Sequence, residues 1–173
     1  MARTDLDIHL SKIDALIKEI NDIAPADSAS YKVVQFRSDL ACLLVVAMAA
    51  TYESCVKNIL FDHANNHHAA FGSFASRNFE KLNSRIRISD LMKYCELYDP
   101  SIKVKFKNIL SKKKSSILNR IGKNIESSYE QILDWRHDFA HAGIRNTTIE
   151  EAASTHALAK RVLYLFDKSF TNP

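Results

Sequence analysis

The longest apolar run of the chain reads Leu40-Ala41-Cys42-Leu43-Leu44-Val45-Val46-Ala47-Met48-Ala49-Ala50. A transmembrane helix needs about 20 apolar residues, and this run has 11. Because no face of such a helix is polar, the run predicts a helix in the core of a globular protein, covered on all sides. We therefore expect five of its side chains to be nearly inaccessible: Leu43, Leu44, Val46, Ala47 and Ala50.

Helical patterns dominate the rest of the chain. Apolar residues make up 46% of the 173 residues, whereas glycine and proline occur three times each. Residues 4–23 have the i, i+3, i+4 spacing of a helix with one apolar face. A longer helix, which contains the apolar run, is expected from about Ser28 to His67. The sequence thus predicts an all-α protein.

The second half of the chain predicts shorter helices. Residues 69–87 are irregular apart from one short helix, and helices are expected over 91–98 and 102–110, with a turn at Lys112–Lys114. Another helix is expected from about Asn124. A capping box at Thr147-Thr148-Ile149-Glu150 marks the start of the last helix. We expect a single domain over residues 1–173, an up-and-down helical bundle with one long central helix and a C-terminal helix.

The cysteines and the N-terminus bear on the compartment. Cys42, Cys55 and Cys95 are odd in number and form no CxxC pair, which is typical of reduced core thiols. The first residues lack the apolar core of a signal peptide. The sequence predicts a cytoplasmic protein with no membrane segment.

The positive charge is concentrated in one segment. Residues 101–125 contain eight basic and no acidic residues, which leaves 16 basic against 20 acidic residues elsewhere. Such a segment favours a polyanionic partner, although it can also be a solvated loop and helix face. The residues that we expect to contact the polyanion are Lys112, Lys113, Lys114, Arg120 and Lys123.

The densest group of chemically active side chains lies near the C-terminal end, in Asp134-Trp135-Arg136-His137-Asp138-Phe139-Ala140-His141-Ala142-Gly143. A guanidinium binds a phosphate with a fork of donors, and an imidazole can move protons at neutral pH. Together they suit the cleavage of a phosphodiester. Gly143 is a typical helix stop.

The spacing of Arg136 and His141 has a geometric consequence. Five residues on an ideal helix separate them by about 140° around the axis. For both to meet one phosphate, the helix must end or distort near His141, or two copies must face each other across a twofold axis. We therefore expect a homodimer whose interface lies beside the two motif helices.

The motif resembles the Arg-x(4–6)-His motif of the HEPN superfamily, with His137 at the polar position that often follows the arginine and with the ending Ala-His-Ala-Gly common in nuclease-type members. The superfamily is a small helical bundle with the motif late in the chain and one helix after it, as expected here. The resemblance implies a metal-independent endoribonuclease without a cofactor, similar to toxins and phage-defence effectors of bacteria. It also implies RNA as the substrate and an antitoxin or defence-system protein as a partner.

The resemblance also implies roles for single residues. His141 would be the general acid or base, Arg136 would neutralise developing charge on the phosphate, and His137 would orient groups or contact RNA. An acidic residue on the long second helix often faces the motif, which makes Glu53 a supporting candidate and Asp138 a weaker one. Some relatives have, at the position of Gly143, a tyrosine that a partner transferase adenylylates. The glycine here argues against that mode of regulation.

Two other interpretations of the motif remain open. Asp134, Asp138 and His141 would share one helix face and could hold a metal ion, although we expect none. The domain could also be a non-catalytic helical module that dimerises or binds RNA or a partner protein, with the motif residues in ion pairs at a helix end.

Overall fold

The computed structural model describes every residue except 1–2, 28–29, 81, 83–84 and 172–173. The described part is all-α, as predicted, and forms a helical bundle. Its helices are α1 (Arg3–Ile23), α2 (Tyr31–His67), α3 (Ala69–Phe79), α4 (Ile88–Tyr98), α5 (Pro100–Ile121), α6 (Ile125–Ala142) and α7 (Ile149–Thr171).

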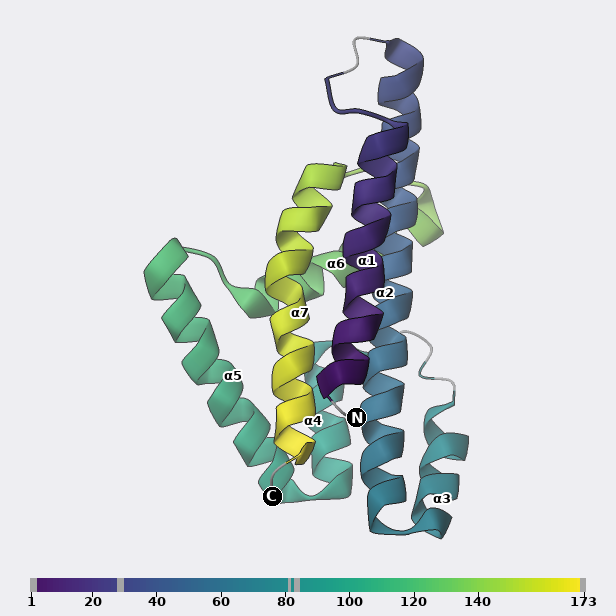
Figure 1. The fold of residues 1–173 in the computed structure, drawn as a ribbon. Coiled ribbons are helices and arrows are strands. Elements are labelled where there is room, and N and C mark those ends of the chain that lie inside the picture. The colour runs from purple at the N-terminus through teal and green to yellow at the C-terminus, as the bar shows by residue number, and fades with distance from the viewer. Residues whose placement is uncertain (1–2, 28–29, 81, 83–84, 172–173) are drawn as a thin grey trace.

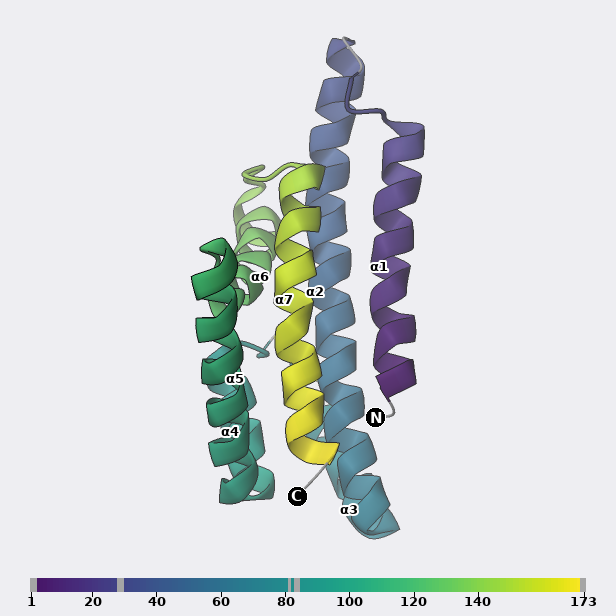
Figure 2. The same ribbon diagram turned by 60° about the vertical axis from the view of Figure 1, so that its left-hand side comes forward.

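Helix α2 is the spine of the bundle. It has 37 residues, and α1 and α7 lie alongside it while α3 folds back against its lower end (Figures 1 and 2). Helix α6 crosses behind α7 and also contacts α2. By length and composition α2 could cross a membrane, and within this fold it packs against α1, α3, α6 and α7.

The apolar run within α2 is only partly covered. Leu44 is 1% exposed, but Leu43 is 56% exposed. Ala50 is exposed as well, and Val46 and Ala47 are half-buried. The prediction of coverage on all sides was therefore wrong for four of the five residues, because the neighbouring helices cover the other faces of α2. Phe36, Leu43, Ala47 and Ala50 follow one another at steps of seven, four and three residues, and we call these four residues the open stripe.

Helix α5 is longer than predicted, and no turn interrupts it at Lys112–Lys114. The buried residues Ile102, Phe106, Leu110 and Ile117 continue one helical face past the lysines, and lysine itself is a good helix former. The helix ends at Gly122, whose φ of 67° lies in the left-handed region. Helix α5 packs on α4 and α7 and lies on the far side of α7 from α2 (Figures 1 and 2).

Helix α6 carries the motif and ends just after it. The Asn124 side chain accepts a hydrogen bond from the backbone N–H of Glu126 at the start. At the end, Gly143 has a φ of 63° and donates its N–H to the carbonyl of Phe139 at 3.0 Å, so the predicted stop is confirmed. Helix α7 is capped by Thr148, whose Oγ1 accepts from the N–H of Glu151 at 3.1 Å, one residue later than predicted.

Candidate functional site

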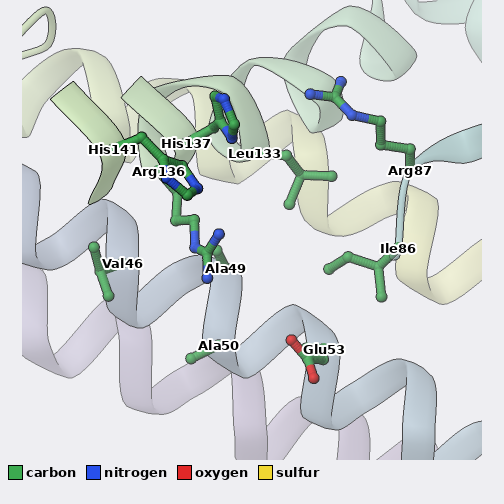
Figure 3. Close-up of a pocket in the computed structure, with 10 residues that line it drawn as sticks. All are labelled: Val46, Ala49, Ala50, Glu53, Ile86, Arg87, Leu133, Arg136, His137 and His141. Atoms are coloured by element: carbon green, nitrogen blue, oxygen red, sulfur yellow. The ribbon is translucent and has the colours of Figure 1, made fainter. Parts of the chain in front are cut away.

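A cavity of about 310 Å³ lies between α2 and α6. Arg136, His137 and His141 line it from α6, together with Leu133, and the segment before α4 adds Ile86 and Arg87. From α2 come Val46, Ala49, Ala50 and Glu53. Figure 3 shows these side chains around the space between the two helices. The fold thus brings the three motif residues and Glu53 to one cavity.

Arg136 extends from α6 toward α2 (Figure 3). The residue is half-buried, and among the described residues no carboxylate or carbonyl is its hydrogen-bond or ion-pair partner. A guanidinium without an internal partner keeps its fork of donors for an anion. Arg136 is therefore available to bind a phosphate in the cavity.

His137 and His141 lie one turn apart in the last turns of α6. Their ring centroids are 4.5 Å apart, and both residues are exposed at the mouth of the cavity. The offset of about 140° between Arg136 and His141 does not separate them, since the long arginine side chain reaches the cavity from its own face of the helix. The helix presents both to one cavity without distortion, so the offset no longer argues for the homodimer expected from the sequence.

Glu53 lies on α2 directly after Tyr52, which is 0% exposed. Its carboxylate forms an ion pair with Lys57, with Oε1 and Nζ 3.0 Å apart. Because Tyr52 is fixed in the core, the next residue is held at the cavity wall that faces the motif (Figure 3). The position fits the supporting role suggested for Glu53.

Asp138, the second acidic candidate, does not line the cavity. Its Oδ2 accepts a hydrogen bond from Nδ2 of Asn146 at 2.9 Å, and its carbonyl accepts from the N–H of Ile144 at 3.4 Å. Both bonds tie the loop after Gly143 to the end of α6. Asp138 therefore holds the loop and is not brought to the site.

The carboxylates proposed for a metal have different partners. Asp134 binds Arg87, and Asp138 binds Asn146. In the part of the chain that the structure describes, no group of three or more His, Cys, Asp or Glu side chains is placed to hold a metal ion. The three free cysteines, Cys42, Cys55 and Cys95, are all buried.

The predicted polyanion-binding lysines lie outside the cavity. Lys114 forms an ion pair with Glu126 at 3.0 Å, whereas Lys112, Arg120 and Lys123 are exposed. Glu126 is ten residues before Arg136 on α6, a rise of about 15 Å along the helix. The basic side of α5 and the motif therefore meet opposite ends of α6.

Arg87 is a cavity residue that no local sequence pattern marked. Its Nη1 lies 2.6 Å from Oε2 of Glu130, and its Nη2 lies 2.5 Å from Oδ1 of Asp134, both on α6. The hydrogen bond with Asp134 raises the pKa of the guanidinium, and the bond with Glu130 adds to this. Only the fold places the residue, because Arg87 and Asp134 are 47 positions apart.

The arrangement is a cavity with two guanidiniums, two imidazoles and one carboxylate, built mainly by a long second helix and a late motif helix. Comparisons with curated proteins and with solved structures gave no match. Residues 5–172, nearly the whole chain, match the family RiboL-PSP-HEPN. With its all-α bundle and its motif at the end of α6, the protein belongs to the RiboL-PSP-HEPN family of the HEPN superfamily.

Proposed function

We propose that this protein is a metal-independent endoribonuclease. The observation that carries the proposal is the convergence of Arg136, His137 and His141 on one cavity with Glu53 opposite. Membership of a HEPN family supports an RNA-related function in general. The guanidinium of Arg136, which has no partner among the described residues, and the exposed imidazole of His141 supply the two groups that phosphodiester cleavage requires.

The proposed reaction needs no group beyond the RNA and the protein. The ribose 2′-oxygen forms a bond to the adjacent phosphorus while the bond from phosphorus to the 5′-oxygen of the next nucleotide breaks. The 2′-hydroxyl loses its proton, and the leaving 5′-oxygen gains one. His141 performs one of these two proton transfers as general acid or base, and solvent water takes up or supplies the other proton. The products carry a 2′,3′-cyclic phosphate and a 5′-hydroxyl.

The remaining groups support the charge and the orientation of the phosphate. Arg136 neutralises the negative charge that develops on the phosphate oxygens. His137, one turn from His141, orients the RNA or contacts it. Glu53 offsets part of the positive charge of the cavity. Its ion pair with Lys57 at 3.0 Å also keeps an ammonium group at the edge of the cavity.

We also propose that the protein acts as a homodimer. The open stripe exposes apolar side chains along α2 with the spacing of a helix seam, and its small residues, Ala47 and Ala50, allow a second helix to come close. Ala50 also lines the cavity. A second copy seated on the open stripe by a twofold axis would bring two cavities next to each other.

In the biological setting that we propose, the enzyme is a cytoplasmic toxin or phage-defence effector of bacteria. Cleavage of cellular RNA is damaging, so such an enzyme needs a partner that restrains it, either an antitoxin or another protein of a defence system. Lys112, Lys113 and Lys114 on α5 would hold the backbone of a long RNA outside the cavity.

The test is a digest of total RNA in EDTA with the wild type and with His141→Ala. Cleavage by the wild type alone, with cyclic phosphate ends, is the expected result. Cleavage that requires added metal would contradict the mechanism. If neither protein cuts RNA, the domain is a non-catalytic module that dimerises or binds a partner, and the nuclease proposal is wrong.

A further inference from the structure

One polar face of α6 continues from the motif to Arg87. Glu130, Asp134, His137 and His141 follow at steps of four, three and four residues and therefore share this face. Arg87 is bound to Glu130 and Asp134. Its guanidinium thus lies between the levels of Glu130 and Asp134, about 5–10 Å along the axis from His137 and about 10–16 Å from His141. A nucleotide strand that is bound at the motif and continues along α6 would therefore come within reach of this guanidinium.

The backbone on both sides of Arg87 is held against α6. The carbonyl of Ile86 accepts a hydrogen bond from the Tyr129 hydroxyl at 2.8 Å. The N–H of Ile88 donates to Oε1 of Glu130 at 2.8 Å. The residue before and the residue after Arg87 are therefore both tied to α6, and little conformational freedom is lost when the guanidinium meets a ligand.

Arg87 keeps donors for such a ligand. A guanidinium has five N–H groups, and the two ion pairs use one on each terminal nitrogen. The side chain is 45% exposed and lines the cavity beside Leu133. The two flanking carboxylates outweigh its single positive charge, so Arg136 supplies the attraction for a polyanion and Arg87 supplies only directed hydrogen bonds.

We infer that Arg87 binds a second phosphate of the RNA, the one next to the scissile phosphate. The inference rests on the proposed nuclease function and adds a direction to it: the strand runs from His141 along α6 toward Arg87. On the far side of His141, the cavity wall is formed by Val46 and contains no cation among the described lining residues. The next cation on that side, Arg145, lies outside the cavity lining and is paired with Asp39 at 2.7 Å, so the strand is held on one side of the cut.

The test uses short RNAs in which only one sugar carries a 2′-hydroxyl, with a neutral methylphosphonate at either neighbouring phosphate. In the wild type, neutralising one of the two neighbours should lower kcat/KM about two- to fivefold. In Arg87→Ala, the same neutral phosphate should leave kcat/KM unchanged. In Arg87→Lys, it should lower kcat/KM by less than in the wild type. A dinucleotide, which has only the scissile phosphate, should be cut equally by the wild type and by Arg87→Ala.

Several results would overturn the inference. The first is a wild type whose kcat/KM does not change when either neighbouring phosphate is neutralised. The second is an Arg87→Ala protein whose kcat/KM falls as much as that of the wild type. The third is a loss of dinucleotide cleavage in Arg87→Ala, which would mean that Arg87 only supports the cavity wall. The matched control is Lys103→Ala. Lys103 is 38% exposed and forms an ion pair with Glu96 at 2.8 Å, outside the cavity, so its removal should leave the pattern unchanged.

A wild type that cuts no RNA would refute the nuclease proposal separately. The binding of the same oligonucleotides, measured by fluorescence anisotropy with His141→Ala and with the double variant His141→Ala, Arg87→Ala, then decides the phosphate site by itself. Binding weakened by one neutral neighbour only while Arg87 is present supports the site. Equal sensitivity in both proteins, or none, rejects it.

Discussion

The hydroxyl of Tyr52 lies 2.7 Å from Nδ1 of His156, although the two residues are 104 positions apart in the sequence. Both are buried, at 0% and 1% exposure. Tyr52 also stacks on Tyr129 with ring centroids 5.5 Å apart. Helices α2, α6 and α7 are therefore joined by one polar and aromatic contact directly behind Glu53, and this contact fixes the cavity walls relative to each other.

The contact predicts a dependence of stability on pH. Burial, with the nearby Lys160 ammonium, lowers the pKa of His156 to about 4 from a usual value of 6.5. The folded protein therefore keeps the imidazole neutral, whereas the unfolded chain binds a proton at higher pH. The stabilisation from His156 is complete above about pH 6.5 and is lost as the pH falls toward 4, a change of about 3 kcal/mol.

Urea unfolding at pH 7.5 and pH 4.5 measures this loss. His156→Gln can still accept a hydrogen bond from Tyr52 but does not titrate, so it should lose less stability than the wild type over the same interval. Acidic side chains contribute equally to both proteins. If the two proteins lose the same free energy of unfolding, His156 is not the titrating group.

Two adjacent leucines of α2 should differ sharply in their contribution to stability. Leu44→Ala creates a cavity in the core and should cost about 2–5 kcal/mol of unfolding free energy. Leu43→Ala removes a side chain that is 56% exposed and should cost less than about 1 kcal/mol in a monomer. Urea titrations at low protein concentration check both values. A loss below about 1 kcal/mol for Leu44→Ala would show that this run is not the core.

The open stripe predicts the oligomeric state. Light scattering at micromolar concentration should give about twice the chain mass of 19.6 kDa. Leu43→Lys places a charge in the proposed seam and should yield monomers. Leu97 on α4 is even more exposed, at 72%, so Leu97→Lys is the matched control and should leave the dimer intact. A wild-type monomer that still cuts RNA would refute the dimer.

The chemistry of the motif predicts which substitutions rescue activity. Arg136→Ala and His141→Ala should each lose most of the activity while melting at nearly the wild-type temperature, because neither residue is in the core. Arg136→Lys should not restore activity, since an ammonium lacks the planar fork of donors. An RNA with a 2′-deoxy sugar at the cleavage point should resist cutting. Cleavage of that substrate would exclude the 2′-hydroxyl as the nucleophile.

The lysines of α5 should affect long RNAs only. Replacing Lys112, Lys113 and Lys114 by alanine should weaken the binding of all sequences alike and flatten the salt dependence, because fewer counterions are released. Short RNAs confined to the cavity should bind unchanged, since Glu126, the partner of Lys114, lies about 15 Å from Arg136 along α6. An unchanged salt slope for long RNA would place the strand elsewhere.

The local sequence was sufficient for the helices whose signals are local. Apolar spacing marked the long α2, and Gly143 marked the end of α6, because a left-handed φ after a helix favours glycine. The same reasoning failed at Lys112–Lys114, where three lysines suggested a turn although the buried positions continued on both sides. It placed the cap of α7 one residue early, since Thr147 and Thr148 are both able to cap.

By itself, the sequence determined the all-α class, the central helix and the motif with Arg136 and His141. Only the tertiary structure decided which side chains share the cavity. Arg87 is part of the cavity wall because Glu130 and Asp134 on another helix bind its guanidinium. Asp138 is not part of the wall, because its carboxylate is hydrogen-bonded to Asn146. Only the packing showed that Leu43 is uncovered while Leu44 is buried, since coverage depends on how many neighbouring helices the chain provides, and hydropathy does not record that number.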